Sequence, residues 1–260
     1  MNDETPNTIS RRTFSSLITV GAASATIPAL ARAAPPARVR NVVLVHGAYA
    51  DGSCWSDVIV RLQAQGLRAT AVQHPLTTLT ACAEVVQRAI ALQDGPTVLV
   101  GHSYGGVIVS QAGIDPRIAA LVYIAARAPD AGEDYAALAK THPTPPIGAG
   151  LITTDGYIRI AEQAFLRDFA NGVQLQRAKV LQAVQGPVSD RLFQGRTSDA
   201  AWRHKPSWYA VSEQDRTIDP DLQRFMAKRM KATTTEIPSG HLSMISHPDA
   251  VAKLIVAAAG

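Results

Sequence analysis

A serine set between glycines is the strongest chemical signal in the sequence. The segment Gly101-His102-Ser103-Tyr104-Gly105 has glycine-x-serine-x-glycine spacing, and the apolar run Thr97–Val100 directly before it predicts a buried strand. A helical pattern follows from Val107 to Ile114. A sharp turn between strand and helix lifts the serine hydroxyl above a sheet. This context favours Ser103 as a nucleophile over an incidental serine or a phosphate-binding loop, which would end in lysine and serine or threonine.

The same turn predicts a position for a negative charge. The backbone N–H of Tyr104 follows the serine and opens the predicted helix, where backbone donors lack partners and the helix dipole favours an anion. The tetrahedral intermediate of acyl transfer carries negative charge on oxygen. Tyr104 is therefore a candidate oxyanion donor.

A serine nucleophile needs a histidine base, which a carboxylate must orient. Among the histidines, His241 lies in a loop directly after the last predicted strand, whereas His247 adjoins Pro248 and fits a helix cap. The other histidines are His46, His74, His102, His142 and His204. The candidate acids are Asp215, which follows the predicted strand Trp208–Val211, its neighbours Glu213, Asp219 and Asp221, and Asp130 after the fourth strand. Asp219 also fits a helix N-cap.

The elements around these residues alternate between short apolar strands and amphipathic helices. Strands are predicted at 39–45, 67–72, 97–100, 119–125, 208–211 and 233–237, and helices at 55–65, 79–93, 107–114, 221–230 and 248–259. Such alternation predicts right-handed βαβ units and an α/β fold with a mostly parallel central sheet flanked by helices.

The alternation stops between residues 131 and 206. Two helices are predicted there, over Tyr157–Ala170 and Val173–Gln185, separated by Asn171-Gly172. We therefore expect a core of residues 34–130 and 207–260 with a small helical cap, 131–206, inserted after the fourth strand. Such an insertion leaves the carboxyl ends of the strands, where open α/β sheets bind ligands. Its candidate pocket or packing aromatics are Tyr135, Tyr157, Phe165, Phe169 and Trp202.

With these motifs, residues 39–259 resemble the α/β-hydrolase superfamily. The similarity is greatest to compact serine esterases such as plant methylesterases and hydroxynitrile lyases and their bacterial relatives. The family order serine, acid, histidine implies a triad of Ser103, Asp215 and His241. The resemblance also implies that the N–H of Ala48, after His46-Gly47, is the second oxyanion donor beside Tyr104.

The resemblance implies hydrolysis of a small carboxylic ester or lactone through an acyl-enzyme. A serine at position 103 excludes the relatives that use an aspartate nucleophile. Cyanohydrin cleavage is not expected, because the threonine and lysine of the lyases are replaced by Gly47 and Leu242. An amidase, a thioesterase, a cofactor-free perhydrolase or a non-catalytic binding protein remains an alternative. No cofactor or metal is expected, since neither a dinucleotide fingerprint nor a His-Glu-x-x-His motif occurs.

Composition narrows the possible partners. Apolar residues make up 47% and charged residues 18% of the 260 residues, which excludes a disordered chain. The net charge is +4 and no basic run exceeds Arg11-Arg12, so a nucleic-acid partner is not expected. Two cysteines, Cys54 and Cys82, are too few for a disulfide scaffold, and whether they pair is left open.

The N-terminus resembles a bacterial twin-arginine export signal. Arg11-Arg12 precedes a stretch without charge from Thr13 to Ala31, and Ala31-Arg32-Ala33 is a small-x-small cleavage site. We expect residues 1–33 to be a cleaved signal, recognised by the twin-arginine export machinery, and the mature chain to be periplasmic without a stable membrane anchor. The alternatives are a retained anchor and a cytoplasmic extension.

Overall fold

A six-stranded parallel sheet forms the centre of the protein, as seen in a computed structural model that describes residues 39–260. The strand order is β2-β1-β3-β4-β8-β9, and each pair of neighbouring strands is parallel. The strands are β1 (Asn41–Val45), β2 (Arg68–Val72), β3 (Thr97–His102), β4 (Ile118–Ile124), β8 (Ser207–Ser212) and β9 (Thr233–Ile237). The α/β fold with a mostly parallel sheet, predicted from the sequence, is confirmed.

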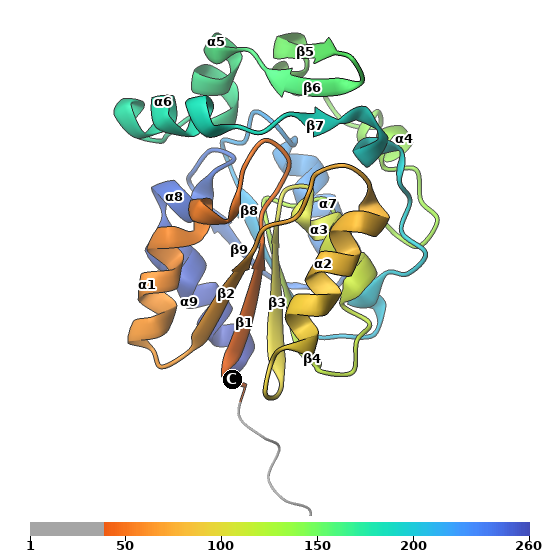
Figure 1. The fold of residues 1–260 in the computed structure, drawn as a ribbon, viewed down its shortest axis with the longest axis vertical. Helices are drawn as coiled ribbons and strands as arrows, with labels where there is room; N and C mark the ends of the chain where they lie inside the picture. Colours follow the sequence, from red (N-terminus) through yellow and green to blue (C-terminus); the bar gives the residue numbers. More distant parts are fainter. Residues whose placement is uncertain (1–38) are drawn as a thin grey trace, which may run out of the picture. The chain divides into compact units, whose positions relative to one another are not determined.

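Helices cover both faces of this sheet (Figure 1). On one face α1 (Ser56–Ala64) packs against α9 (Pro248–Ala259), and on the other α2 (Leu79–Ala91) packs against α3 (Gly105–Ala112). Helix α7 (Pro220–Arg229) packs against β8, and the short α8 (Ser243–Ser246) precedes α9. Strands β1, β3 and β4 are almost entirely buried, which explains why their sequences are continuous apolar runs rather than alternating ones.

The segment between β4 and β8 lies over the carboxyl ends of the strands, at the top of Figure 1. It contains a second, three-stranded antiparallel sheet in the order β5-β6-β7. Its elements are α4 (Tyr135–Ala139), β5 (Leu151–Thr154), β6 (Tyr157–Ile160), α5 (Glu162–Ala164), a π-helix (Phe165–Phe169), α6 (Leu175–Val184) and β7 (Val188–Ser189). Short 3-10 turns occupy Gly52–Trp55, Pro146–Gly150, Asp190–Gln194 and Ala201–Arg203.

The helix predicted over Tyr157–Ala170 is wrong in its first part. Tyr157–Ile160 forms strand β6, and only the residues from Glu162 onward are helical. The reason is the dipeptide Asp155-Gly156, whose φ values of 49° and 77° make the turn between β5 and β6. Asp-Gly with two positive φ angles is the preferred turn of a two-residue β-hairpin. The second predicted helix, Val173–Gln185, is confirmed as α6.

The structure answers the open question of the two cysteines. Cys54 and Cys82 are both buried free thiols, so they do not pair with each other in this structure. Among residues 39–260, no helix is both long enough and apolar enough to cross a bilayer. The predicted signal, residues 1–33, lies outside the described residues.

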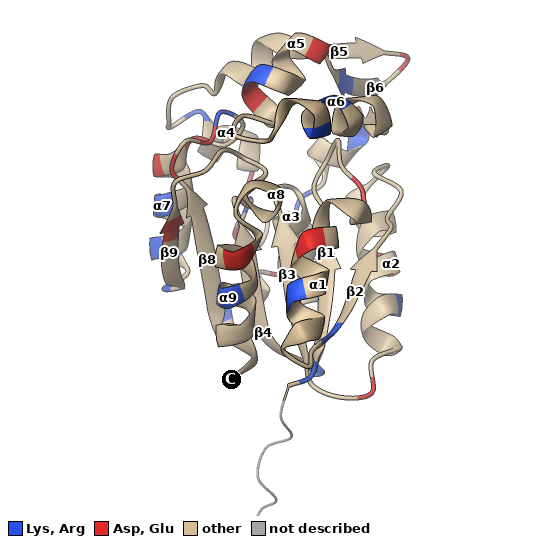
Figure 2. Ribbon diagram, turned by 90° about the vertical axis from the view of Figure 1, so that its left-hand side faces the viewer, with Lys and Arg blue, Asp and Glu red and all other residues tan. Residues whose placement is uncertain are grey.

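Figure 2 shows Lys and Arg interspersed with Asp and Glu over the face that carries α1 and α9.

Candidate active site

Ser103 occupies a strained turn between β3 and α3. Its φ is +53°, in the left-handed region that residues with a side chain rarely adopt. Three backbone hydrogen bonds hold it there: its N–H donates to the Ile124 carbonyl at 3.2 Å, and its carbonyl accepts from Gly106 at 3.1 Å and from Arg127 at 2.9 Å. The residue is 6% exposed and lines a cavity beneath the cap. The predicted turn geometry at the serine is present.

The glycines of this turn allow backbones to approach closely. A Cβ atom on Gly101 would lie 2.7 Å from the Gly105 carbonyl oxygen, and one on Gly105 would lie 2.5 Å from the Val45 carbonyl oxygen. A Cβ on Gly47 would lie 2.6 Å from the Ser103 Cβ. The glycines therefore let β1, β3 and α3 converge around the serine.

We expect Gly105→Ala to lower the free energy of unfolding by about 1–3 kcal/mol, since the added methyl must displace the backbone of β1. Gly186→Ala is the matched control, because a Cβ at Gly186 meets nothing within 4 Å. Urea unfolding followed by circular dichroism measures both variants. Equal stability of the two would contradict the close approach at Gly105.

Asp215 and His241 are brought together by the loops after β8 and β9. The His241 Nδ1–H donates to Asp215 Oδ2 at 2.7 Å, and both side chains are fully buried. Asp215 also accepts from the Gln223 side chain at 2.7 Å and from the N–H groups of Thr217 and Ile218 at 2.7 and 3.0 Å. This hydrogen bonding leaves the proton on Nδ1 and makes Nε2 of His241 the basic nitrogen.

The His241 Nε2 is buried and has no hydrogen-bond partner among residues 39–260. No hydrogen bond joins it to the Ser103 hydroxyl in this structure. His241 nevertheless contacts two residues that lie next to Ser103. The His241 ring packs 5.2 Å from the Phe169 ring, which lines the cavity with Ser103, and 4.6 Å from the ring of His102. The structure thus places a free basic nitrogen beside the serine turn.

The two candidate oxyanion donors lie at the same end of the sheet. Ala48 follows β1 and Tyr104 precedes α3, and both residues line the cavity beside Ser103. Within the described part of the chain, neither backbone N–H donates a hydrogen bond. Two such unpaired donors near the serine suit a site that receives an anionic oxygen.

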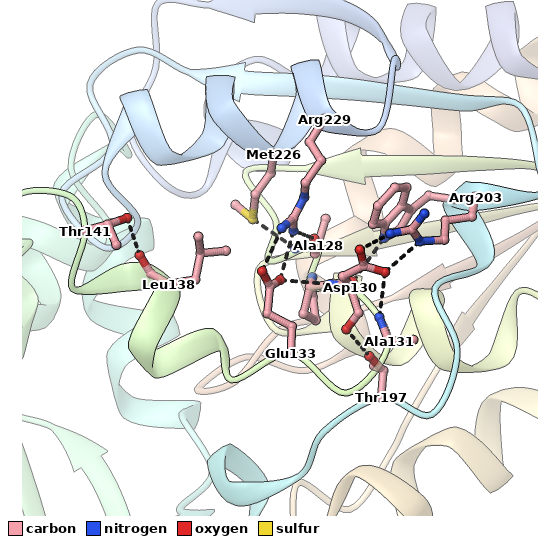
Figure 3. Close-up of polar contacts among 12 residues, drawn as sticks. Ala128, Asp130, Ala131, Glu133, Leu138, Thr141, Thr197, Arg203, Met226 and Arg229 are labelled. Atoms are coloured by element: carbon pink, nitrogen blue, oxygen red, sulfur yellow. Dashed lines mark hydrogen bonds and ion pairs between the residues drawn. The ribbon is translucent and has the colours of Figure 1, made fainter.

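Asp130, the second candidate acid, is engaged elsewhere. Its carboxylate pairs with the Arg203 guanidinium, and its Oδ1 accepts from the Ala131 N–H at 2.8 Å (Figure 3). Asp219 caps α7 as predicted, and Asp221 pairs with Arg224. The alternative base His247 contacts the Ser246 hydroxyl at the start of α9. None of these groups hydrogen-bonds His241.

The cavity above Ser103 has a volume of about 360 Å³ and is lined largely by apolar and aromatic side chains. Of the aromatic residues singled out in the sequence, Tyr135 and Phe169 line it. Phe165 is buried outside this cavity, Tyr157 is exposed, and the Trp202 indole donates to the Pro129 carbonyl. Three other lining residues, Tyr49, Arg127 and Phe193, have no signal in the sequence, and they come from segments far apart in the chain.

The cap is attached to the loop that carries Asp215. The buried Asp168 carboxylate of the π-helix accepts from Arg216 Nε at 2.7 Å and pairs also with Arg167. Next to it, the Asn171 side chain donates to the Gln214 carbonyl at 2.8 Å. Arg216 therefore pairs with a cap residue rather than with Asp215.

Three further histidines surround the serine turn in a neutral state. Burial lowers the pKa of His74 to about 3, with a smaller contribution from His46, and burial also lowers the pKa values of His46 and His102. The His46 and His74 rings stack at 3.9 Å, and His74 Nε2 donates to the His46 carbonyl at 3.0 Å. His102 Nε2 donates to the His241 carbonyl at 3.0 Å. These contacts connect His74 to His46 after β1, and His102 to His241.

These lowered pKa values predict a loss of stability in acid. The unfolded chain takes up protons below its ordinary histidine pKa of about 6.5, whereas folded His74 stays neutral down to about pH 3. Each such histidine lowers the free energy of unfolding by up to about 1.4 kcal/mol per pH unit as the pH falls through this window. When the pH is lowered from 7 to 5, we expect the free energy of unfolding to fall by about 2 kcal/mol more in the wild type than in His74→Gln. Urea unfolding at the two pH values measures this difference. The exposed His204→Gln is the control, and an unchanged pH slope in His74→Gln would contradict the prediction.

Comparison with known proteins identifies the family. The family model described as "Alpha/beta hydrolase family" matches residues 42–254, most of the chain. The chain belongs to the α/β-hydrolase family. An α/β-hydrolase from Aspergillus novofumigatus, nvfD, is 26% identical over 242 residues, covering 84% of this chain and 96% of that protein. Methylesterase 2 from Arabidopsis thaliana is 24% identical over 259 residues, covering 85% and 97%.

Solved structures agree with this assignment of the fold. Polyneuridine aldehyde esterase superimposes with a TM-score of 0.74 at 18% identity, covering 85% of this chain and 99% of that one. The resemblance inferred from the motifs is thus confirmed. Together the relatives place this α/β-hydrolase among the carboxylic ester hydrolases.

Proposed function

We propose that this α/β-hydrolase cleaves small carboxylic esters with Ser103 as nucleophile, His241 as base and Asp215 as the acid that orients the base. The observation that carries the proposal is the buried hydrogen bond between His241 Nδ1 and Asp215, which leaves the histidine Nε2 unpaired beside the serine turn. Catalytic hydrogen bonds are often long before substrate binds, so the missing bond between Ser103 and His241 is compatible with this role.

In this mechanism Ser103 Oγ attacks the ester carbonyl while His241 Nε2 takes the hydroxyl proton. The carbonyl oxygen becomes an anion, which accepts hydrogen bonds from the N–H groups of Ala48 and Tyr104. Collapse of this intermediate expels the alcohol, which takes the proton from His241, and leaves an acyl group on Ser103. Water then attacks the acyl-enzyme, again giving a proton to His241, and the carboxylic acid departs as the serine recovers its proton.

The size of the cavity favours a small substrate. Its volume of about 360 Å³ lies near the lower end of the range for small-molecule sites, and residues of the cap form part of its wall. The lining of Tyr49, Tyr135, Phe169 and Phe193 provides apolar surface for an acyl or alcohol group. An emulsified triglyceride would not fit in this space.

Hydrolysis of p-nitrophenyl acetate, butyrate and octanoate by the predicted mature chain, residues 34–260, tests the proposal. We expect turnover of the shorter esters and labelling of Ser103 by a fluorophosphonate, located by mass spectrometry of the peptides. Labelling without ester turnover would indicate an amide, thioester or peroxide reaction on the same residues. A protein that neither turns over esters nor becomes labelled would be a binding protein, and the proposal would be wrong.

The proposed site of action is the periplasm, on the basis of the twin-arginine-like N-terminus. We expect the full chain, expressed in a bacterium with the twin-arginine pathway, to appear in the periplasm with Ala34 as its first residue. Replacement of both Arg11 and Arg12 by lysine should retain the precursor in the cytoplasm. Equal export of the two forms would contradict this part of the proposal.

A further inference from the structure

Arg127 is a cation in the cavity wall that has no partner. Its side chain lines the cavity with Ser103, and it makes no hydrogen bond or ion pair with any described residue. Its Nε is buried and unpaired. A buried guanidinium nitrogen without an acceptor is costly, because its hydration is lost and nothing replaces it. This unpaired charge is therefore available to a ligand.

Three aromatic rings hold this guanidinium in place. Its central carbon lies 4.6 Å from the Tyr135 ring centroid, 5.0 Å from that of Phe193 and 5.8 Å from that of Tyr104. Contacts of a cation with ring faces are favourable, and they limit the rotamers of the long side chain. The backbone N–H of the same residue donates to the Ser103 carbonyl at 2.9 Å. Arg127 is thus fixed beside the candidate nucleophile.

The other ionisable groups of the cavity do not neutralise Arg127. The Glu133 carboxylate is occupied by two hydrogen bonds from Arg229, at 2.7 and 2.9 Å, and by the Asp130 N–H at 2.9 Å (Figure 3). Burial raises the pKa values of Tyr49 and Tyr135 to about 12, so both phenols stay neutral near pH 7. The second cation that lines the cavity, Arg196, is paired with Asp134 at 2.9 Å.

We propose that Arg127 determines specificity by binding a carboxylate of the substrate, so that the preferred substrates are half-esters of dicarboxylic acids. A guanidinium binds a carboxylate through two parallel charge-assisted hydrogen bonds, and the aromatic contacts hold this guanidinium in position for them. The ester end lies at Ser103 and the free carboxylate at Arg127. This inference rests on the proposed function, since it names the class of ester that the same site takes.

The reaction remains an ordinary hydrolysis. Water supplies a hydroxyl to the acyl carbon and a proton to the leaving alcohol. The new carboxylic acid loses its proton near neutral pH, so a half-ester monoanion yields an alcohol, a dicarboxylate dianion and a proton. Arg127 binds the carboxylate that is present from the start and takes no part in proton transfer.

Hydrolysis of monomethyl adipate and of methyl hexanoate by the purified protein tests the inference. The two esters have the same acyl chain length and differ in the terminal carboxylate. We expect a kcat/KM at least tenfold higher for monomethyl adipate, measured by methanol release. Arg127→Met keeps the side-chain length and removes the charge, and should lower this ratio tenfold or more. Arg127→Lys keeps the positive charge and should retain part of the preference for monomethyl adipate.

Arg159→Gln is the matched control, because it removes an exposed cation of β6 that does not line the cavity, and we expect the ratio to change less than twofold. Independently of any variant, hexanoate should inhibit methyl hexanoate hydrolysis by the wild type at least tenfold more strongly than the uncharged hexanamide does. Circular dichroism and residual methyl hexanoate hydrolysis report whether Arg127→Met is folded.

The outcomes separate this inference from the proposed function. Hydrolysis of methyl hexanoate without preference for the half-ester, or an unchanged ratio in Arg127→Met, would overturn the inference and leave the esterase assignment intact. The inference also fails if a fluorophosphonate labels Ser103 but neither ester is hydrolysed. If Ser103 is not labelled and neither ester reacts, the proposed function fails, and the inference fails with it.

Discussion

Ser103→Ala should abolish ester hydrolysis while leaving the protein folded. Removal of the nucleophile from a serine triad lowers kcat by about 10⁶-fold, and the residual rate comes from the oxyanion donors and from substrate binding. The fold should persist, because the turn at Ser103 is held by three backbone hydrogen bonds and by the neighbouring glycines, none of which uses the hydroxyl. Initial rates with p-nitrophenyl butyrate at matched protein concentration measure the effect.

The control for this experiment is Ser110→Ala, a buried serine of α3 whose hydroxyl contacts the Tyr123 hydroxyl at 3.0 Å. Loss of a hydrogen bond between neutral groups costs about 1 kcal/mol of stability and should leave kcat within a few-fold of the wild type. A Ser103→Ala protein that retains more than a hundredth of the wild-type rate would exclude Ser103 as the nucleophile.

Asp215→Asn should lower kcat by about 10⁴-fold with the fold preserved. The carboxylate accepts hydrogen bonds from the Gln223 amide and from His241 on the same oxygen. An asparagine can offer only one acceptor oxygen, and its amide nitrogen would donate rather than accept toward His241. The histidine then keeps the wrong tautomer, with the proton on Nε2, and cannot take the proton of Ser103. Steady-state kinetics measure the loss.

Asp130→Asn distinguishes between the two candidate acids. Because Asp130 pairs with Arg203 and has no contact with His241, this change should alter kcat by less than tenfold. A larger loss in Asp130→Asn than in Asp215→Asn would contradict the assignment of the acid, since the two variants make the same chemical change at two positions after neighbouring strands of the sheet.

The sheet and the serine turn could be predicted because their physical signals are local. The apolar runs of β1, β3 and β4 predict buried parallel strands, and the glycines around Ser103 can be explained only by a close approach of strand and helix. The prediction of His241 and Asp215 as base and acid is less direct. Both residues follow one of the last two strands of the sheet. Only the order of serine, acid and histidine along the chain of a known family assigns them these roles.

The cap was predicted less well because its signals are short or depend on distant contacts. The hairpin β5–β6 is signalled by a single Asp155-Gly156 pair, within a stretch whose apolar spacing also fits a helix. Arg127 follows β4 as one arginine among many. Its lack of a partner is visible only when Tyr135, Phe193 and the Glu133–Arg229 pair are placed around it.

The cap contains two groups of residues that differ in how strongly a substitution affects the catalytic candidates. The π-helix is joined to the acid loop through Asp168 and Arg216, so a substitution there disturbs the position of Asp215. The hairpin β5–β6, by contrast, is exposed along most of its length, yet it contributes Leu151 and Ile158 to the cavity wall. Mutations in the hairpin can therefore reshape the substrate range without affecting the hydrogen bond between Asp215 and His241.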